Sequence, residues 1–209
     1  MTQLTLTYFD MPGGRGEPIR LALHLGGIAF EDKRFAYADF AQVRATTPLG
    51  QVPTLEVDGV QVTQSDALLR YAGKLAGLYP TDPFQALLCD EVLQGAEDAN
   101  IKLSATFGLQ GDALKQAREA LAHPETGALP KYLRWLQSLL LAHGGQFFAD
   151  NRLTIADLKV LVWVNGLRSG RLDHIPLDMV NTAAPELLAY LNRIAATPAI
   201  AAWYARFKG

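Results

Sequence analysis

Residues 48–66 read PLGQVPTLEVDGVQVTQSD and contain the clearest structural signals of the chain. Two short strand-like runs, TLEV and VQVT, flank Asp58-Gly59, a pair typical of a two-residue hairpin turn. Ser65 then stands where a helix N-cap belongs, before a helical pattern that ends near Gly77. The stretch therefore predicts a hairpin that leads directly into a helix.

The residues before this stretch alternate between strand and helix patterns. Alternate side chains from Leu4 to Tyr8 fall on one face of a predicted strand. A cluster of glycines and a proline follows, and a helix is expected to open at Glu17-Pro18, because proline is tolerated in a first helical turn. A second strand is expected over residues 29–35.

The residues after it change pattern. Two prolines within residues 79–83 indicate a linker, and beyond it the apolar period is about 3.6 residues almost throughout. Helices are expected over residues 84–107, 112–122, 129–143, 154–169, 185–196 and 199–207. The sequence thus predicts an α/β plus all-α protein, with a βαβαββα domain over residues 1–78 and an all-helical domain over residues 84–209.

Composition argues against several classes of protein. Hydrophobic residues make up 49% and charged residues 19% of the chain, which is ordinary globular usage. A formal net charge of −2 and a pI near 6.1 offer no basic surface for nucleic acid or an anionic membrane. No run approaches the ~18 apolar residues of a membrane helix, and the first residues do not resemble a secretion signal. We therefore expect neither nucleic acid nor a membrane as a partner.

The single cysteine and the histidines suggest no redox or metal chemistry. Cys89 can form no intrachain disulfide, which suits a reducing compartment such as the cytoplasm. It lies within an apolar helical stretch, so a core position is expected rather than a nucleophile. The four histidines are scattered without metal-ligand spacing, and no metal site is expected.

Five motifs occur in order along the chain. Tyr8-Phe9 precedes GRGEPIR (14–20), which is followed by PLGQVPTL (48–55), QSDALLR (64–70), Glu97-Asp98 and LTIAD (153–157). Through these motifs the sequence resembles the cytosolic glutathione transferases, nearest to the sigma class and its relatives with a catalytic tyrosine. The resemblance implies a thioredoxin-like first domain that binds glutathione as co-substrate. It also implies a helical domain that supplies most of an apolar pocket for an electrophile.

Tyr8 is the expected catalytic residue. It ends the first strand at the edge where open α/β sheets bind ligands. A phenol with a pKa near ~10 stays protonated at neutral pH and can donate a hydrogen bond to an anionic sulfur. Such a bond is worth about 1.5–3 kcal/mol, enough to lower a thiol pKa by roughly one to two units. The thiolate is the nucleophile.

Gln51, Val52 and Pro53 are expected to hold the cysteinyl part of glutathione. A residue before proline is extended, so Val52 can offer its backbone N–H and C=O to a peptide by strand addition. The resemblance implies that the Val52–Pro53 bond is cis. On the residues alone, an ordinary proline loop before a strand is the better explanation of this segment.

The two ends of glutathione have separate candidates. Gln64 and Ser65 precede a helix, whose N-terminal N–H groups and dipole favour an anion, and the resemblance places the γ-glutamyl carboxylate there. Arg44 and Phe40 align with positions that hold the glycyl end. Arg15 aligns with an arginine that orients the tyrosine and the sulfur, although Pro12-Gly13 lengthen this loop relative to the family.

Three further expectations concern the helical half. Thr154 and Asp157 form a capping box with a structural role. Asp98 is expected to reach the glutathione of a partner subunit in a homodimer, where the resemblance places an aspartate, whereas on the residues alone a solvated helix carboxylate is the better explanation. The electrophile pocket is assigned to Met11, Leu103, Phe107 and Phe207, for each of which plain core packing is an alternative.

Two alternatives to conjugation share this fold. A glutathione-dependent isomerase, such as a prostaglandin synthase, would use Tyr8 on another second substrate. A non-catalytic binding or structural relative would keep the fold without the chemistry. A thiol–disulfide oxidoreductase would need a Cys-x-x-Cys motif after the first strand, which this sequence lacks.

Overall fold

The computed structural model describes residues 2–206 and divides into two compact units. One unit contains the chain up to Pro80 together with the segment from Pro198 onward, and the other contains Thr81–Thr197. The sequence pattern had placed the last helix in the helical domain. It belongs to the first unit instead, because α10 (Pro198–Ala205) packs against α1 (Glu17–Leu25).

The first unit is built on a four-stranded mixed sheet of order β2-β1-β3-β4. In it β1 and β2 are parallel, whereas β1 and β3, and β3 and β4, are antiparallel. The strands are β1 (Leu4–Phe9), β2 (Glu31–Phe35), β3 (Thr54–Val57) and β4 (Val60–Val62). The second strand was expected over residues 29–35, whereas β2 begins two residues later, at Glu31.

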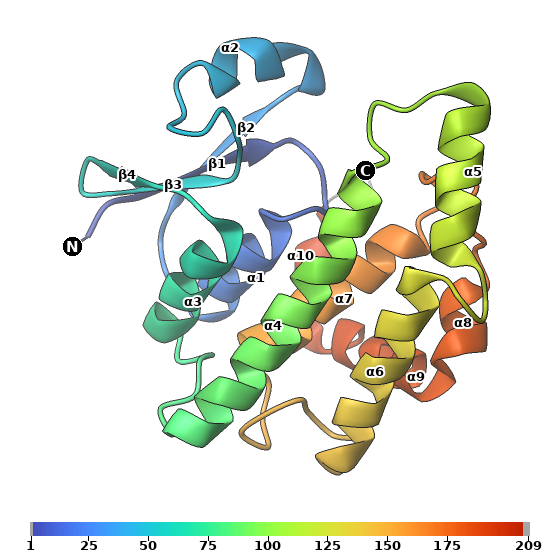
Figure 1. The fold of residues 1–209 in the computed structure, drawn as a ribbon. Coiled ribbons are helices and arrows are strands. Elements are labelled where there is room, and N and C mark those ends of the chain that lie inside the picture. Colours follow the sequence, from blue (N-terminus) through green and yellow to red (C-terminus); the bar gives the residue numbers. More distant parts are fainter. Residues whose placement is uncertain (1, 207–209) are drawn as a thin grey trace. The chain divides into compact units, whose positions relative to one another are not determined.

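Helices cover both faces of this sheet (Figure 1). On one face lie α1 and α3 (Ser65–Leu75), against the buried side chains of Leu4 and Leu6, as the alternation in β1 predicted. On the other lies α2 (Phe40–Arg44), preceded by the short 3-10 helix η1 (Tyr37–Asp39). The element order is the predicted βαβαββα, and the thioredoxin-like arrangement is confirmed.

The turn between β3 and β4 confirms the hairpin prediction. Asp58 and Gly59 have φ of 49° and 85°, so both central residues are left-handed, as the tight turn demands. The turn is tied back to the chain start, because the backbone N–H of Gln3 donates to the Asp58 carboxylate at 2.8 Å.

In the second unit, the described residues form helices and connecting loops but no strands. Its helices are α4 (Pro83–Ser104), α5 (Gly111–Ala122), α6 (Ala128–Ala142), α7 (Ile155–Leu167), α8 (Met179–Ala183) and α9 (Pro185–Ala195). All but α8 were predicted. Every residue of α7 from Ile155 to Val164 is buried, so α7 forms the centre of this unit, with α4 and α9 packed against it.

The start of α7 confirms the predicted capping box. Asp157 is fully buried, and its carboxylate accepts the backbone N–H of Thr154 at 2.6 Å and the Thr154 hydroxyl at 3.0 Å. It also accepts the Phe148 backbone N–H and the Tyr190 hydroxyl. Burial raises the pKa of Asp157 above its usual range, while these four donors favour the charged form.

Candidate active site

One end of the sheet brings together the segments that carry the predicted site. Because β1 and β2 are parallel, with Phe9 opposite Phe35, both strands end there. The register of Thr7 with Thr54 shows that β3 begins at this end, and β4, antiparallel to β3, ends there. The loops around Tyr8, α2, Pro53 and the start of α3 therefore meet at one edge, where ligands of open α/β sheets bind.

Tyr8 is held by the loop that follows it. Its side chain is 7% exposed, and its hydroxyl oxygen accepts the backbone N–H of Arg15 at 3.0 Å. Gly14 and Gly16 permit this approach, since a Cβ on Gly14 would overlap the Tyr8 hydroxyl and one on Gly16 would overlap its ring. Pro12-Gly13, which lengthen this loop, are thus followed by a backbone turn that packs closely against the Tyr8 phenol.

Two arginines contact this region in different ways. Arg15, the predicted arginine, reaches Tyr8 through its backbone N–H. Arg20, to which the sequence assigned no role, lies with its guanidinium carbon 5.7 Å from the centre of the Tyr8 ring. It donates to the carbonyls of Phe9 and Met11, both at 3.1 Å. A completely buried cation therefore fixes the backbone that follows Tyr8.

The segment before β3 has the expected backbone. The Val52–Pro53 bond is cis, which confirms that prediction. Gln51 is exposed, Val52 is half-buried and Pro53 is buried. Because β3 begins at Thr54, Val52 lies just outside the sheet ladder, at the place where strand addition would require it.

The start of α3 differs from the prediction in one detail. Ser65 is the first helical residue and Gln64 takes the N-cap position, with φ of 75° and ψ of 99°. Left-handed backbone in a residue other than glycine costs of order 1–3 kcal/mol and concentrates at functional sites. The Gln64 side chain makes no capping bond, and Asp66 stands in the first turn of α3, where the positive end of the helix dipole favours negative charge.

Phe40 and Arg44 lie on α2 at the same sheet end. The Arg44 guanidinium carbon is 5.5 Å from the centre of the half-buried Phe40 ring. A Cβ built on Gly50 would lie 3.5 Å from an Arg44 guanidinium nitrogen. Arg44 thus places a cation beside the loop that carries Gln51.

The remaining predicted residues are divided between the units. Met11 follows β1 in the first unit, whereas Leu103 (buried) and Phe107 (58% exposed) belong to the second. Phe207 lies outside the described residues. Asp98 is an exposed residue of α4, in the second unit. The electrophile pocket and the role of Asp98 therefore stay predictions.

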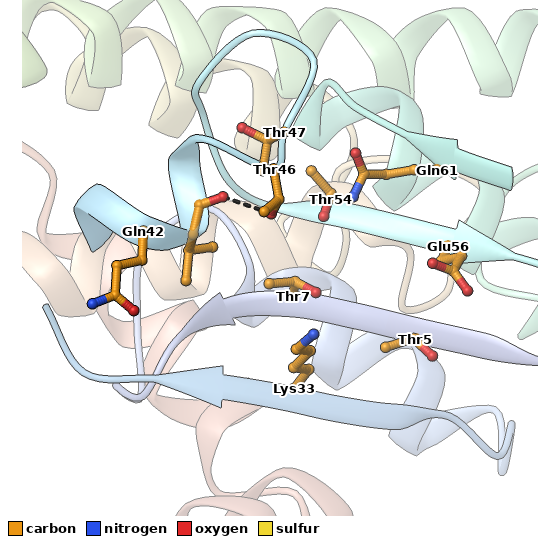
Figure 2. A pocket seen from close by; sticks show the side chains of 10 residues that line it. Thr5, Thr7, Lys33, Gln42, Thr46, Thr47, Thr54, Glu56 and Gln61 are labelled. Atoms are coloured by element: carbon orange, nitrogen blue, oxygen red, sulfur yellow. Dashed lines mark hydrogen bonds between the residues drawn. The ribbon is translucent and has the colours of Figure 1, made fainter. Parts of the chain in front are cut away.

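A hollow of about 290 Å³, lined mostly by residues with polar side chains, opens on the α2 side of the sheet (Figure 2). It is lined by strand side chains, including Thr5, Thr7 and Lys33, and by α2 and the residues after it. Thr46 and Thr47 donate their hydroxyls to nearby backbone carbonyls. None of the predicted site residues lines this hollow.

Three further features of residues 2–206 concern metal-binding side chains, membrane helices and the single cysteine. No group of three or more metal-binding side chains occurs there, and none of these helices is both long and apolar enough to cross a membrane. Cys89 is fully buried, and burial raises the pKa of its thiol to about 12. This thiol therefore stays protonated and unreactive in the folded protein.

Comparison with known proteins decides the family. The family model "Glutathione S-transferase, N-terminal domain" matches residues 4–74, and the model "Glutathione S-transferase, C-terminal domain" matches residues 102–206. The chain belongs to the glutathione S-transferase family. The family's enzymes use glutathione as co-substrate.

Individual relatives agree with this family. Glutathione S-transferase 1 of Ascaris suum is 35% identical over 77% of this chain and 78% of its own. The hematopoietic prostaglandin D synthase of Gallus gallus is 32% identical over 97% of this chain and 96% of its own. The structure of prostaglandin synthase D of Nilaparvata lugens superposes with a TM-score of 0.85, at 31% identity and 98% coverage of both chains. This glutathione S-transferase therefore has sigma-like relatives, as its motifs suggested.

Gly14→Ala tests the close approach of the loop to Tyr8. Gly14 and Gly27 both have left-handed φ, 68° and 63°, so alanine strains the backbone at either position, by about 1–2 kcal/mol. A Cβ at Gly27 meets nothing within 4 Å, whereas at Gly14 it displaces the phenol. We expect Gly14→Ala to lower glutathione-dependent turnover at least tenfold and Gly27→Ala to change it less than twofold. Equal turnover in the two variants at matched thermal stability would contradict this reading.

Proposed function

We propose that this transferase binds glutathione at the sheet end around Tyr8, stabilises its thiolate with the Tyr8 hydroxyl and conjugates it to small apolar electrophiles. The observation that carries the proposal is the hydrogen bond from the Arg15 backbone to the Tyr8 oxygen. A hydroxyl that accepts a hydrogen bond is polarised and donates its own proton more strongly. As the resemblance implies, this activity would serve detoxification in the cytoplasm.

We assign the γ-glutamyl and cysteinyl parts of glutathione to residues at the same edge of the sheet as Tyr8. The γ-glutamyl carboxylate binds at Gln64 and Ser65, where the α3 dipole favours negative charge. The cysteinyl backbone pairs with Val52 beside Gln51 and Pro53, a geometry supported by the half-buried position of Val52 outside the ladder.

The glycyl carboxylate and the sulfur have different neighbours. Arg44 binds the glycyl carboxylate as a cation, and Phe40 forms an apolar wall beside it. Arg15 supports the sulfur end through Tyr8. The electrophile would react at the sulfur, with Met11, Leu103, Phe107 and Phe207 kept as the pocket residues predicted from the sequence, and no metal is expected.

An isomerase is the second candidate function. Two relatives that match almost the whole chain are prostaglandin D synthases by name. In such a reaction the thiolate would attack a second substrate and later leave again, so that glutathione is regenerated. The same Tyr8 hydroxyl would serve both reactions.

A substrate panel separates these functions. The enzyme is assayed with glutathione and, in turn, a chloro-nitro aromatic, a hydroperoxide and an isomerisable endoperoxide, with Tyr8→Phe assayed in parallel. Conjugation consumes glutathione in step with product, whereas isomerisation leaves its concentration unchanged. A chain that turns over none of them would contradict both functions.

The proposed partner is a second copy of this chain, and Asp98 tests it. An aspartate from the partner subunit would bind the ammonium group of the γ-glutamyl residue. The carboxylate of the same residue is assigned to Ser65. We expect Asp98→Asn to raise the glutathione Kd about tenfold while kcat at saturation changes little, since one charge-assisted hydrogen bond is lost. Glu91→Gln, which removes an exposed charge from the same helix, is the matched control. Calorimetric titration and sedimentation provide the readouts, and a fully active monomer at micromolar concentration would overturn the prediction.

A further inference from the structure

A completely buried carboxylate joins the last helix to the Tyr8 loop. The indole N–H of Trp203 on α10 donates to Glu17 Oε1 at 2.6 Å, across 186 residues of sequence. The other oxygen, Oε2, accepts from Nη1 of Arg20 at 3.3 Å. The side chains of Glu17 and Arg20 have no exposed surface. The proposed chemistry uses neither of them.

Arg20 carries this link onward to Tyr8. Its guanidinium donates to the Phe9 carbonyl, directly after Tyr8, and to the Met11 carbonyl. Its Nε donates to Asp32 at 2.9 Å, which anchors the group to β2. Removing the Glu17 charge would therefore loosen the cation that fixes the backbone on the C-terminal side of Tyr8.

We propose that Trp203 is a positioning residue for Tyr8, acting through the Glu17 carboxylate and the Arg20 guanidinium. The proposal rests on the proposed role of Tyr8 in stabilising the thiolate. It assigns the last helix a part in setting the reactivity of bound glutathione. Trp203 need not contact either substrate for this effect.

The charges around Glu17 explain why the indole matters. Burial raises the pKa of Glu17, whereas the bond from Trp203 and the charges of Arg20 and Arg34 lower it. On α10, burial and the Glu17 charge raise the pKa of Tyr204. The indole N–H is one of the groups that counteract the effect of burial on the Glu17 pKa. Its loss would therefore raise this pKa further. A protonated Glu17 no longer forms an ion pair with Arg20.

Two more titratable or charged groups lie near this cluster. The centres of the His24 and Trp203 rings are 4.9 Å apart, and the guanidinium carbon of Arg206 lies 5.1 Å from the centre of the Trp203 ring. Burial and Arg206 lower the pKa of His24, so this imidazole is mostly neutral near pH 7. Asp32, shared by Arg20 and Arg34, completes the set.

Trp203→Phe tests the proposal, because it keeps an aromatic ring and removes the N–H. Three quantities are measured: the pH midpoint for ionisation of the bound glutathione thiol, followed by thiolate absorbance; kcat/KM for the electrophile; and KM for glutathione. We expect the midpoint to move upward and kcat/KM for the electrophile at neutral pH to fall about threefold to tenfold. The KM for glutathione should change less than twofold. Trp135→Phe, in the second unit, should leave all three unchanged.

A double-mutant cycle with Glu17→Gln tests the route of the effect. If Trp203 acts through the Glu17 charge, Glu17→Gln shifts the midpoint in the same direction, and adding Trp203→Phe shifts it no further. Additive effects would overturn the proposal. So would a Trp203→Phe enzyme with a lowered melting temperature but an unchanged midpoint and kcat.

Tyr8→Phe, measured alongside, separates this inference from the proposed function. If Tyr8→Phe leaves the midpoint unchanged, the role of Tyr8 itself fails. If Tyr8→Phe moves the midpoint and Trp203→Phe does not, only the inference about Trp203 fails. Glu17→Gln supplies the decisive midpoint if Trp203→Phe does not fold, since the proposal requires an upward shift in that variant too.

Discussion

Replacing Tyr8 with phenylalanine should lower kcat by about tenfold or more, while the Kd for glutathione changes little. The variant loses one hydrogen bond to a charged sulfur, worth about 1.5–3 kcal/mol, and that bond forms only with the thiolate. The ring remains and keeps its buried position against the Gly14–Gly16 loop. The pH midpoint of the bound thiol should rise by roughly one to two units.

The measurement needs a substrate for which chemistry limits turnover, established by varying the electrophile's leaving group. Tyr132→Phe removes a hydroxyl from a half-buried tyrosine of α6 and serves as the control. A Tyr8→Phe enzyme with an unchanged chemical step would refute the assignment of Tyr8. A large rise in the Kd for glutathione would show that the hydroxyl acts in ground-state binding instead.

Replacing Asp157 with alanine should give the largest loss of stability, about 3–5 kcal/mol. The carboxylate is completely buried and accepts hydrogen bonds from Thr154, Phe148 and Tyr190. Its removal leaves buried donors without an acceptor, at a cost of about 1–3 kcal/mol each, part of which relaxation recovers. Thr154→Ala, which removes only the threonine part of the box, should cost about 0.5–2 kcal/mol.

Denaturant unfolding of both variants tests whether Asp157→Ala loses more stability than Thr154→Ala. The dependence of the unfolding free energy on denaturant concentration should be the same in the variants and the unmodified protein. The fraction that remains folded should keep nearly normal kcat and KM, because we assign the box a structural role. A stable Asp157→Ala enzyme without activity would show that the carboxylate takes part in the reaction.

The sequence predicted those features that depend on local residue types. Asp58-Gly59 between two strand-like runs favours a tight turn, and Thr154 with Asp157 before an apolar run favours a helix start. The cis bond before Pro53 came from the resemblance, since the residues alone favoured an ordinary trans loop. The short helix α8 was missed because five residues hold too little of a helical period to be recognised.

Features that depend on distant partners, or on a backbone conformation that the residue type does not favour, could not be predicted. Ser65 was the expected N-cap, because serine is preferred there, and only the backbone shows that Gln64 takes the position. The overlap that Gly14 avoids exists only once Tyr8 has been placed. Glu17 was expected to open a helix, but its indole partner lies at the other end of the chain.

The return of the last helix to the first unit has a consequence for chain architecture. The helical unit is an insertion within the other, because Thr81–Thr197 interrupt a unit that described residues on both sides of them form together. A fragment cut at Pro80 lacks the indole that pairs with Glu17 and is an incomplete folding unit. Chimaeras between relatives should therefore exchange residues 81–197 as a cassette and keep the two flanking segments from one parent. A single crossover near Pro80 would pair α1 with a foreign α10.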